Sequence, residues 1–147
     1  MRHWRPGEGV DELHLALDLE ARALAEAQRQ LASFLAERGC PTDVRFRVEL
    51  VVEEVVMNVI RHARLDGATR AALHARYDGG LAAIAIEDDG PAFDPLAAPL
   101  PPVGEALSGH RDGGFGLHLI RRHSDGARYA RATDGNRLEL EFSPRHD

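Results

Sequence analysis

The chain has very little cysteine and no long hydrophobic run, and each scarcity excludes a class of protein. Its 147 residues include one cysteine, Cys40, which excludes an internal disulfide and a zinc site built from several cysteines. No stretch approaches the ~18 consecutive apolar residues of a membrane-spanning helix, and the N-terminal MRHWRPGEG has no apolar signal-peptide core. The sequence therefore predicts a cytoplasmic protein that has no membrane anchor.

An excess of basic charge is also absent. The chain has 24 acidic and 18 basic residues and a net charge of −6. Clustered lysine and arginine give proteins their affinity for nucleic acid and for anionic membranes, so neither is an expected partner. The length suits one domain with a hydrophobic core of its own. We expect a flexible leader over residues 1–11 and a single domain over residues 12–143.

The hydrophobic pattern predicts a regular series of helices and strands. The expected elements are a strand over 12–19, a helix over 20–38 that ends at Gly39, a valine-rich helix that begins at Pro41, strands over 69–77 and 81–88 joined by a turn at Asp78-Gly79-Gly80, a helix over 115–123, and a final hairpin with its turn at Asp134-Gly135-Asn136. In this order the helices pack on one face of a mixed, mostly antiparallel sheet. The predicted fold class is an α+β two-layer sandwich.

Three polar residues interrupt the apolar stripe of the valine-rich helix. Glu54, Asn58 and His62 follow one another at intervals of four residues, so they lie nearly on one face of the helix. On a helical wheel, Asn58 and His62 fall at one edge of the valine stripe and Glu54 a little further round. We expect all three to face a crevice beside the core and to line a functional site.

Asp88 ends a strand at a position where a charge is unexpected. Ile84, Ile86 and Asp88 share one parity along the strand, so the carboxylate points where the isoleucines point. A carboxylate there is costly unless it has a partner. From Pro91 to Gly114 the sequence is rich in proline and glycine, which predicts a long functional loop or lid.

Three segments together resemble a known family. EEVVMNVIRHA resembles the N box of the GHKL ATPase superfamily, DDGPAFDP its G1 box and GGFGLHLI its G2 box, in the family's order and spacing. The short length and the E-x-x-x-N-x-x-x-H form resemble the anti-sigma-factor serine kinases within that superfamily. This resemblance implies the Bergerat ATP-binding fold, with ATP and Mg²⁺ as cofactors.

The resemblance also implies a role for each matched residue. Asn58 would coordinate Mg²⁺, Asp88 would accept a hydrogen bond from the adenine amino group, and Glu54 would be the general base. His62 is expected to hydrogen-bond near the pocket rather than to act as an acid. The other implied nucleotide contacts are Gly90, Phe93, Arg111, Gly113, Gly114, Gly116 and Leu117. Family members often have Gly-Thr in the last hairpin, and this chain has Gly135-Asn136 instead.

Two functions remain open from the sequence. The first is a Mg-ATP-dependent kinase that phosphorylates a serine of a STAS-domain antagonist (an anti-anti-sigma factor) and also binds a sigma factor; the family implies dimers. The second is a nucleotide-dependent binding switch without phosphotransfer. A histidine-kinase fragment is a weaker alternative, because the sequence before Leu13 has no room for phosphoacceptor helices.

Overall fold

The computed structural model describes residues 11–66, 70–96 and 114–145 of the chain. Its elements are β1 (Glu12–Leu17), α1 (Ala21–Glu37), α2 (Thr42–Asp66), β2 (Ala71–Asp78), β3 (Leu81–Asp88), α4 (Gly114–His123), β4 (Gly126–Ala132) and β5 (Gly135–Phe142). Most of the predicted lid, residues 97–113, and all but the last residue of the predicted leader lie outside the described residues. Within these described ranges, no helix combines the length and the apolar character needed to cross a membrane.

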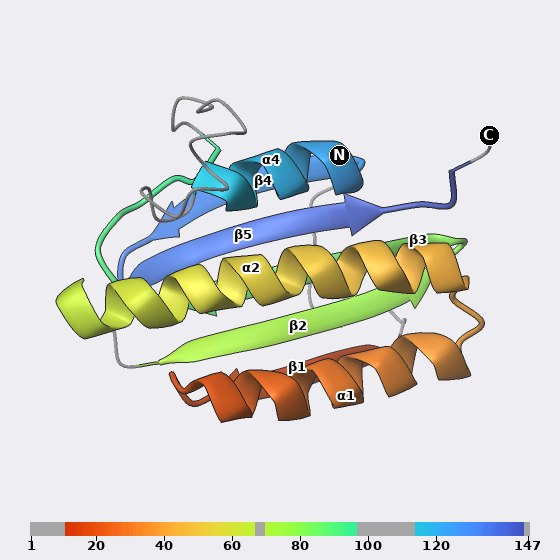
Figure 1. Cartoon of the computed structure of the whole chain (residues 1–147), viewed down its shortest axis with the longest axis horizontal. Helices are drawn as coiled ribbons and strands as arrows, with labels where there is room; N and C mark the ends of the chain where they lie inside the picture. The colour runs from red at the N-terminus through yellow and green to blue at the C-terminus, as the bar shows by residue number, and fades with distance from the viewer. Residues whose placement is uncertain (1–10, 67–69, 97–113, 146–147) are drawn as a thin grey trace.

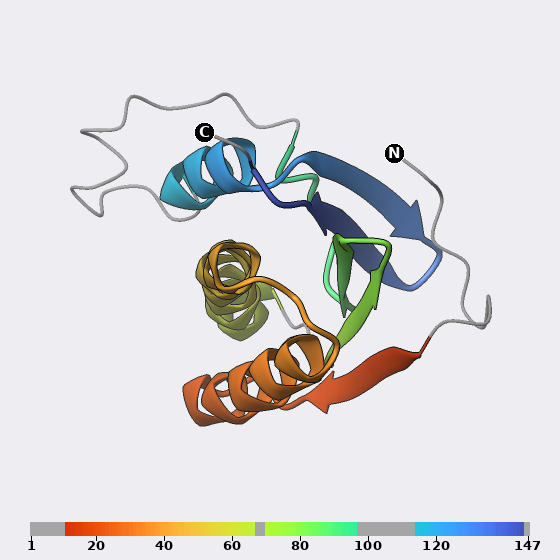
Figure 2. The same ribbon diagram turned by 90° about the vertical axis from the view of Figure 1, so that its right-hand side faces the viewer.

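The strands form one five-stranded sheet in the order β1-β2-β3-β5-β4. The three described helices cover one face of this sheet (Figures 1 and 2). The predicted α+β two-layer sandwich is therefore confirmed. Every strand pair of the described sheet is antiparallel, so the parallel component expected in a mixed sheet is not found among these pairs. The reason is that β5 returns beside β3 in the opposite direction after α4 and β4.

Helix α2 is the central helix of the helical layer, with α1 on one side and α4 on the other (Figure 2). Its valines Val44, Val48, Val51 and Val52 have no exposed surface and pack in the main hydrophobic core. Because valine is a mediocre helix former, this tertiary packing stabilises α2 more than the intrinsic preference of its residues does. The packing also fixes which of its side chains face outward beside the core.

The two hairpin turns differ in their use of glycine. Between β2 and β3, Gly79 and Gly80 adopt φ angles of 60° and 85°, as a tight two-residue hairpin requires, and the predicted turn is confirmed. The predicted turn at Asp134-Gly135-Asn136 is wrong, because Gly135 already pairs with Ala132 as the first residue of β5. Residues 133 and 134 make that turn, and Gly135 serves a different purpose.

Candidate functional site

One end of the molecule gathers most of the elements that carry the predicted site. Figure 1 shows there the C-terminal half of α2, the end of β3, the start of β5 and the start of α4. The antiparallel register explains the meeting of the two strands, since Asp88 at the end of β3 pairs with Asn136 at the start of β5. Four elements from distant parts of the sequence thus contribute to one region.

Asp88 lies on the helix-facing side of the sheet, as its parity predicts. Ile84 and Ile86 precede it on the same side and are buried. Its Oδ1 atom accepts hydrogen bonds from the backbone N–H of Gly90, at 2.9 Å, and from Nδ2 of Asn136, at 3.0 Å. Within the described part of the chain, no hydrogen bond reaches its Oδ2 atom. One oxygen of the carboxylate therefore remains available as an acceptor.

The turn after Asp88 is held by residues of the β4–β5 hairpin. The buried Gly90 accepts a hydrogen bond on its carbonyl oxygen from Arg131, at 2.7 Å. The backbone N–H of Phe93 donates to Oδ1 of Asn136 at 3.2 Å. Phe93 is 53% exposed. The sequence pattern did not predict these hairpin contacts.

Gly135 allows the hairpin to approach this close. A Cβ atom at position 135 would lie 2.2 Å from the carbonyl oxygen of Asp88, far inside van der Waals contact. The φ angle of Gly135 is not positive, so the glycine is required by space and not by backbone conformation. The start of β5 is thereby pressed against the end of β3.

Two residues of the predicted polar stripe of α2, Glu54 and Asn58, have described side chains. Glu54 and Asn58 are half-buried, whereas the neighbouring Glu53 is exposed. The Oδ1 atom of Asn58 accepts a hydrogen bond from Arg61 at 3.2 Å. The same oxygen is the one that the resemblance assigns to Mg²⁺, so metal binding would replace the Arg61 contact. The side chain of His62 lies outside the described residues.

Helix α4 begins at Gly114, within the predicted glycine cluster. Gly114 and Gly116 lie in its first turn, where backbone N–H groups have no partner within the helix and can bind an anion. Leu117 is only 3% exposed, so it packs inside the protein and offers little surface to a ligand. Arg111 and Gly113 lie outside the described residues.

The side-chain oxygen of Asn58 is of the ligand type that a magnesium ion accepts. In the described ranges, no group of three or more His, Cys, Asp or Glu side chains is arranged to hold a metal. Mg²⁺ usually takes only one or two protein oxygens and completes its shell with water and phosphate oxygens. The half-buried amide oxygen of Asn58 is compatible with that mode of binding.

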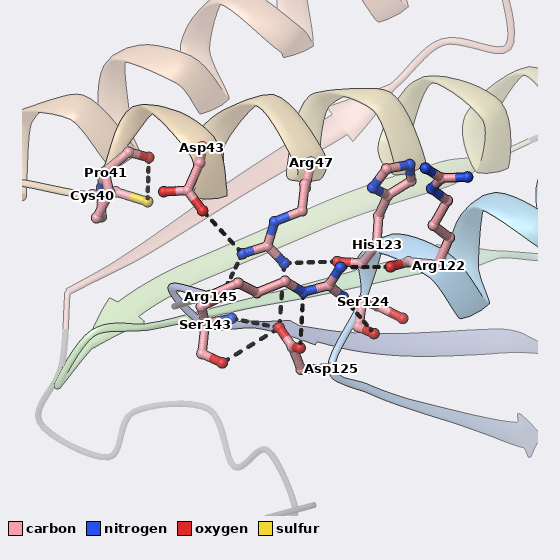
Figure 3. Close-up of polar contacts among 10 residues, drawn as sticks. All are labelled: Cys40, Pro41, Asp43, Arg47, Arg122, His123, Ser124, Asp125, Ser143 and Arg145. Carbon is pink, nitrogen blue, oxygen red and sulfur yellow. Dashed lines mark hydrogen bonds and ion pairs between the residues drawn. The ribbon is translucent and has the colours of Figure 1, made fainter. Parts of the chain in front are cut away.

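The opposite end of α2 carries a second polar cluster, centred on Arg47 (Figure 3). This side chain is 7% exposed. Its Nη1 atom donates to the carbonyl oxygen of His123, at 2.8 Å, and to Asp125, at 3.3 Å. Its Nη2 atom donates to Asp43, at 3.4 Å, and to the carbonyl oxygen of Ser143. Arg47 thus joins α2 to the end of α4 and to the residue that follows β5.

Two titratable groups in the Arg47 cluster have shifted pKa values. Burial alone would raise the pKa of Asp125, but the backbone N–H of Ser143 and the charges of Arg145 and Arg47 outweigh it, and the pKa is lowered. The pKa of His123 is also lowered, mainly by burial and further by Arg122, Arg145 and Arg47. Both shifts favour an ionised Asp125 and a neutral His123 at neutral pH.

A separate surface groove of about 400 Å³ lies against α1. Leu13, Phe34 and Arg38 are among its lining residues. Among the residues that the structure describes, no predicted site residue lines this groove. It therefore has no part in the site at the end of β3.

Comparison with known proteins identifies the class to which this fold and site belong. Residues 17–142 match the histidine kinase-like ATPase domain family, and the chain belongs to that family. The chain is similar to the serine/threonine-protein kinase BtrW of Bordetella bronchiseptica, with 33% identity over 128 residues, which is 86% of this chain and 89% of BtrW. The predicted resemblance to the GHKL superfamily and its anti-sigma-factor serine kinases is confirmed.

Two solved structures share the fold at low sequence identity. A Mycobacterium tuberculosis protein with RsbU and RsbW domains superposes with a TM-score of 0.64 and 19% identity, covering 90% of this chain. This chain spans 32% of that protein's chain. The histidine kinase domain of a blue-light activated kinase from Erythrobacter litoralis gives a TM-score of 0.51 and 17% identity, over 95% of this chain and 65% of the other.

Proposed function

We propose that the protein is a Mg-ATP-dependent serine kinase of the anti-sigma-factor type, acting on a STAS-domain antagonist in a partner-switching system. The observation that carries the proposal is Asp88, a carboxylate at the end of a buried row with one oxygen bound and the other available. The available oxygen needs a hydrogen-bond donor, and the amino group of adenine is such a donor. The similarity to BtrW, which is named a serine/threonine-protein kinase, supports phosphotransfer.

Three segments of the chain contribute different contacts to the proposed site. Asp88 accepts from the adenine amino group, and the buried Gly90 leaves room for the base. The first turn of α4 presents backbone N–H groups to the phosphates. Asn58 supplies an oxygen ligand to Mg²⁺, which neutralises phosphate charge during transfer. The exposed ring of Phe93 is a further candidate contact.

Glu54 is the proposed general base, because it lies one helical turn before Asn58 and is half-buried. Glu54 takes the proton of the serine hydroxyl as the serine oxygen bonds to the γ-phosphorus and ADP leaves. The phosphorylation state of the antagonist would then decide whether the protein binds the antagonist or a sigma factor. A homodimer is the assembly that the family implies.

The test replaces Glu54 with alanine and measures two quantities. As a kinase, Glu54→Ala should keep its ATP affinity and lose about a hundredfold or more of its phosphotransfer rate, since general-base catalysis contributes that much. Transfer is measured with labelled ATP, Mg²⁺ and a STAS-domain protein encoded beside this one, and scored as phosphoserine. Glu53→Ala is the matched control, because Glu53 is the exposed neighbour on the same helix.

The second function is a nucleotide-dependent switch in which ATP is bound but not consumed. It is favoured if the unmodified protein binds ATP and a STAS partner yet forms no phosphoserine, and if Glu54→Ala leaves partner choice unchanged. Equal phosphotransfer by Glu54→Ala and Glu53→Ala would remove Glu54 from the mechanism. Absence of ATP binding by the unmodified protein would overturn both functions.

A further inference from the structure

Asn136 is a buried amide that connects Asp88 to the turn following it. The residue is 9% exposed. Its Nδ2 atom donates to Oδ1 of Asp88, at 3.0 Å, and to the carbonyl oxygen of Pro91, at 2.9 Å. Its Oδ1 atom accepts from the backbone N–H of Phe93 and from the hydroxyl of Tyr129. A single side chain therefore contacts the carboxylate and both ends of the 91–93 turn.

The orientation of this amide is determined by its surroundings. The partners on one side, Asp88 Oδ1 and Pro91 O, are both acceptors. The partners on the other side, Phe93 N–H and Tyr129 O–H, are able to donate. Turning the amide over would place an oxygen against a carboxylate and a carbonyl, which is unfavourable. The NH₂ group must therefore face Asp88.

We propose that Asn136 is a positioning residue that holds the Asp88 carboxylate with Oδ2 directed to the nucleotide base. Two fixed donors on Oδ1, the Gly90 N–H and the Asn136 amide, hinder rotation of the carboxylate about its last bond. The acceptor is then presented in one place and one direction. This inference rests on the proposed function, because it concerns the recognition of adenine by Asp88.

The close approach at Gly135 is an independent observation in favour of this role. Because Gly135 has no side chain, the backbone of β5 can approach the carbonyl of Asp88 closely. Asn136, the next residue, pairs directly with Asp88 in the strand register. Asn136 therefore acts from a rigid backbone position, as a residue that orients another side chain must.

Fixing the carboxylate has a consequence for the choice of base. An ionised carboxylate is only an acceptor, so it favours the 6-amino group of adenine and disfavours the 6-oxo group of hypoxanthine. If the carboxylate could turn freely, this discrimination would weaken while contacts to the phosphates would persist. Selectivity for ATP over inosine triphosphate therefore reports on the role of Asn136 more specifically than ATP affinity does.

The experiment measures the affinities of the protein for Mg-ATP and Mg-inosine triphosphate by calorimetry. Asn136→Asp keeps the shape of the side chain and an acceptor for Phe93 and Tyr129, but it loses the donor to Asp88. The ratio of the two affinities should fall roughly tenfold, the usual cost of a hydrogen bond to a charged group. An unchanged ratio would overturn the proposal and would mean that the contacts of Asn136 are purely structural.

Two further variants keep the result interpretable. Asn136→Ala also removes the donor to Asp88, and it serves as the test if Asn136→Asp does not fold. The ratio of the ATP affinity to the inosine triphosphate affinity should fall in Asn136→Ala as well. Leu138→Ala is the control, because Leu138 is a buried residue of the same strand with no described hydrogen bond to Asp88. It should lower the melting temperature without changing the ratio. A loss of selectivity in Leu138→Ala as large as in the Asn136 variants would overturn the proposal.

Preserved selectivity in both Asn136 variants would reject this inference alone; no nucleotide binding by the unmodified protein would reject the proposed function as well.

Discussion

Helix α2 has a polar cluster near each of its ends, and the two clusters differ in how completely their polar atoms are used. At the N-terminal end, both terminal nitrogens of Arg47 donate to oxygens of several elements. At the other end, Asp88 uses one oxygen for Gly90 and Asn136, and in the described part of the chain the second accepts no hydrogen bond. Both terminal nitrogens of Arg47 have acceptors within the chain, whereas one oxygen of Asp88 has no donor in the described part of the chain.

This difference indicates what each cluster contributes. A buried polar group with all its partners stabilises the fold, and losing a partner is costly. A polar group that is held firmly but only partly hydrogen-bonded gives up stability and gains the capacity to bind a donor from outside. We therefore expect substitutions at Arg47 to reduce stability and substitutions at Asp88 to reduce binding, with little overlap between the two effects.

The largest expected effect is that of Asp88→Asn on nucleotide binding. The substitution keeps the size of the side chain but can place an NH₂ group where the adenine amino group needs an acceptor. ATP affinity should fall by about a hundredfold or more, as when a hydrogen-bonding site loses its complement. Calorimetry with Mg-ATP measures this directly, and an unchanged affinity would remove the adenine assignment of Asp88.

The adjacent carboxylate offers a control for that experiment. Asp89 directly follows β3, and it accepts a hydrogen bond from the backbone N–H of Arg70, the residue before β2, at 2.9 Å. Asp89→Asn makes the same chemical change one residue later, and ATP affinity should stay within about threefold, less than one ordinary hydrogen bond. Equal losses in both variants would show that general charge, and not the position of Asp88, determines binding.

The next effect in size is that of Arg47→Met on stability. Methionine keeps an apolar stem of similar length and removes the arginine donor from Asp125 and from the carbonyl oxygens of His123 and Ser143. The free energy of unfolding should fall by about 3 kcal/mol, the usual result of breaking a buried charged network. Urea unfolding measures this, and ATP affinity below the unfolding transition should change less than about threefold.

An exposed arginine provides the matched control. Arg22 pairs with Glu20, and its side chain is 88% exposed. Arg22→Met should change the free energy of unfolding by less than about 1 kcal/mol, since exposed ion pairs contribute little. If Arg47→Met were as mild as Arg22→Met, the Arg47 cluster would not be the structural element that its hydrogen bonds suggest.

The sequence was sufficient to predict most of the fold. Leucine alternation placed β1, the valine stripe placed α2, and the Gly79-Gly80 pair placed the first hairpin, because each pattern reflects local geometry that tertiary contacts then reinforce. The turn of the last hairpin lies before its predicted position. The local pattern predicts Gly135 as a turn residue, whereas its lack of a side chain allows a close approach to Asp88, about which local sequence carries no information.

The candidate site was predicted in part. The parity of Asp88 and its place beside the isoleucines followed from strand geometry, and they are confirmed. The contacts of Asn136 and Arg131 with the Asp88–Phe93 segment could not be predicted, since they depend on the pairing of β3 with β5. The sequence does contain an indication of the Arg47 cluster, because a charged residue lies beside Val44, Val48 and Val51 in an apolar stripe.

The smallest expected effect is a loss of stability in acid in two separate pH windows. The folded pKa of His123 lies below its ordinary value of 6.5, so the unfolded chain takes up a proton first as the pH falls. Stability is then lost as the pH decreases from 6.5 through the lowered folded pKa. The folded pKa of Asp125 lies below its ordinary value of 3.8, so its contribution is present above that pH and is lost below it.

Two substitutions should remove these losses one at a time. Urea midpoints measured from neutral pH downward should show the upper loss disappear in His123→Gln and the lower loss disappear in Asp125→Asn. Both residues belong to the Arg47 cluster, so neither variant should alter the affinity for ATP at neutral pH. If His123→Gln followed the curve of the unmodified protein throughout, His123 would not be the group that titrates. If either variant weakened ATP binding as Asp88→Asn is expected to do, the two ends of α2 would be coupled, and the separation of stability from binding would fail.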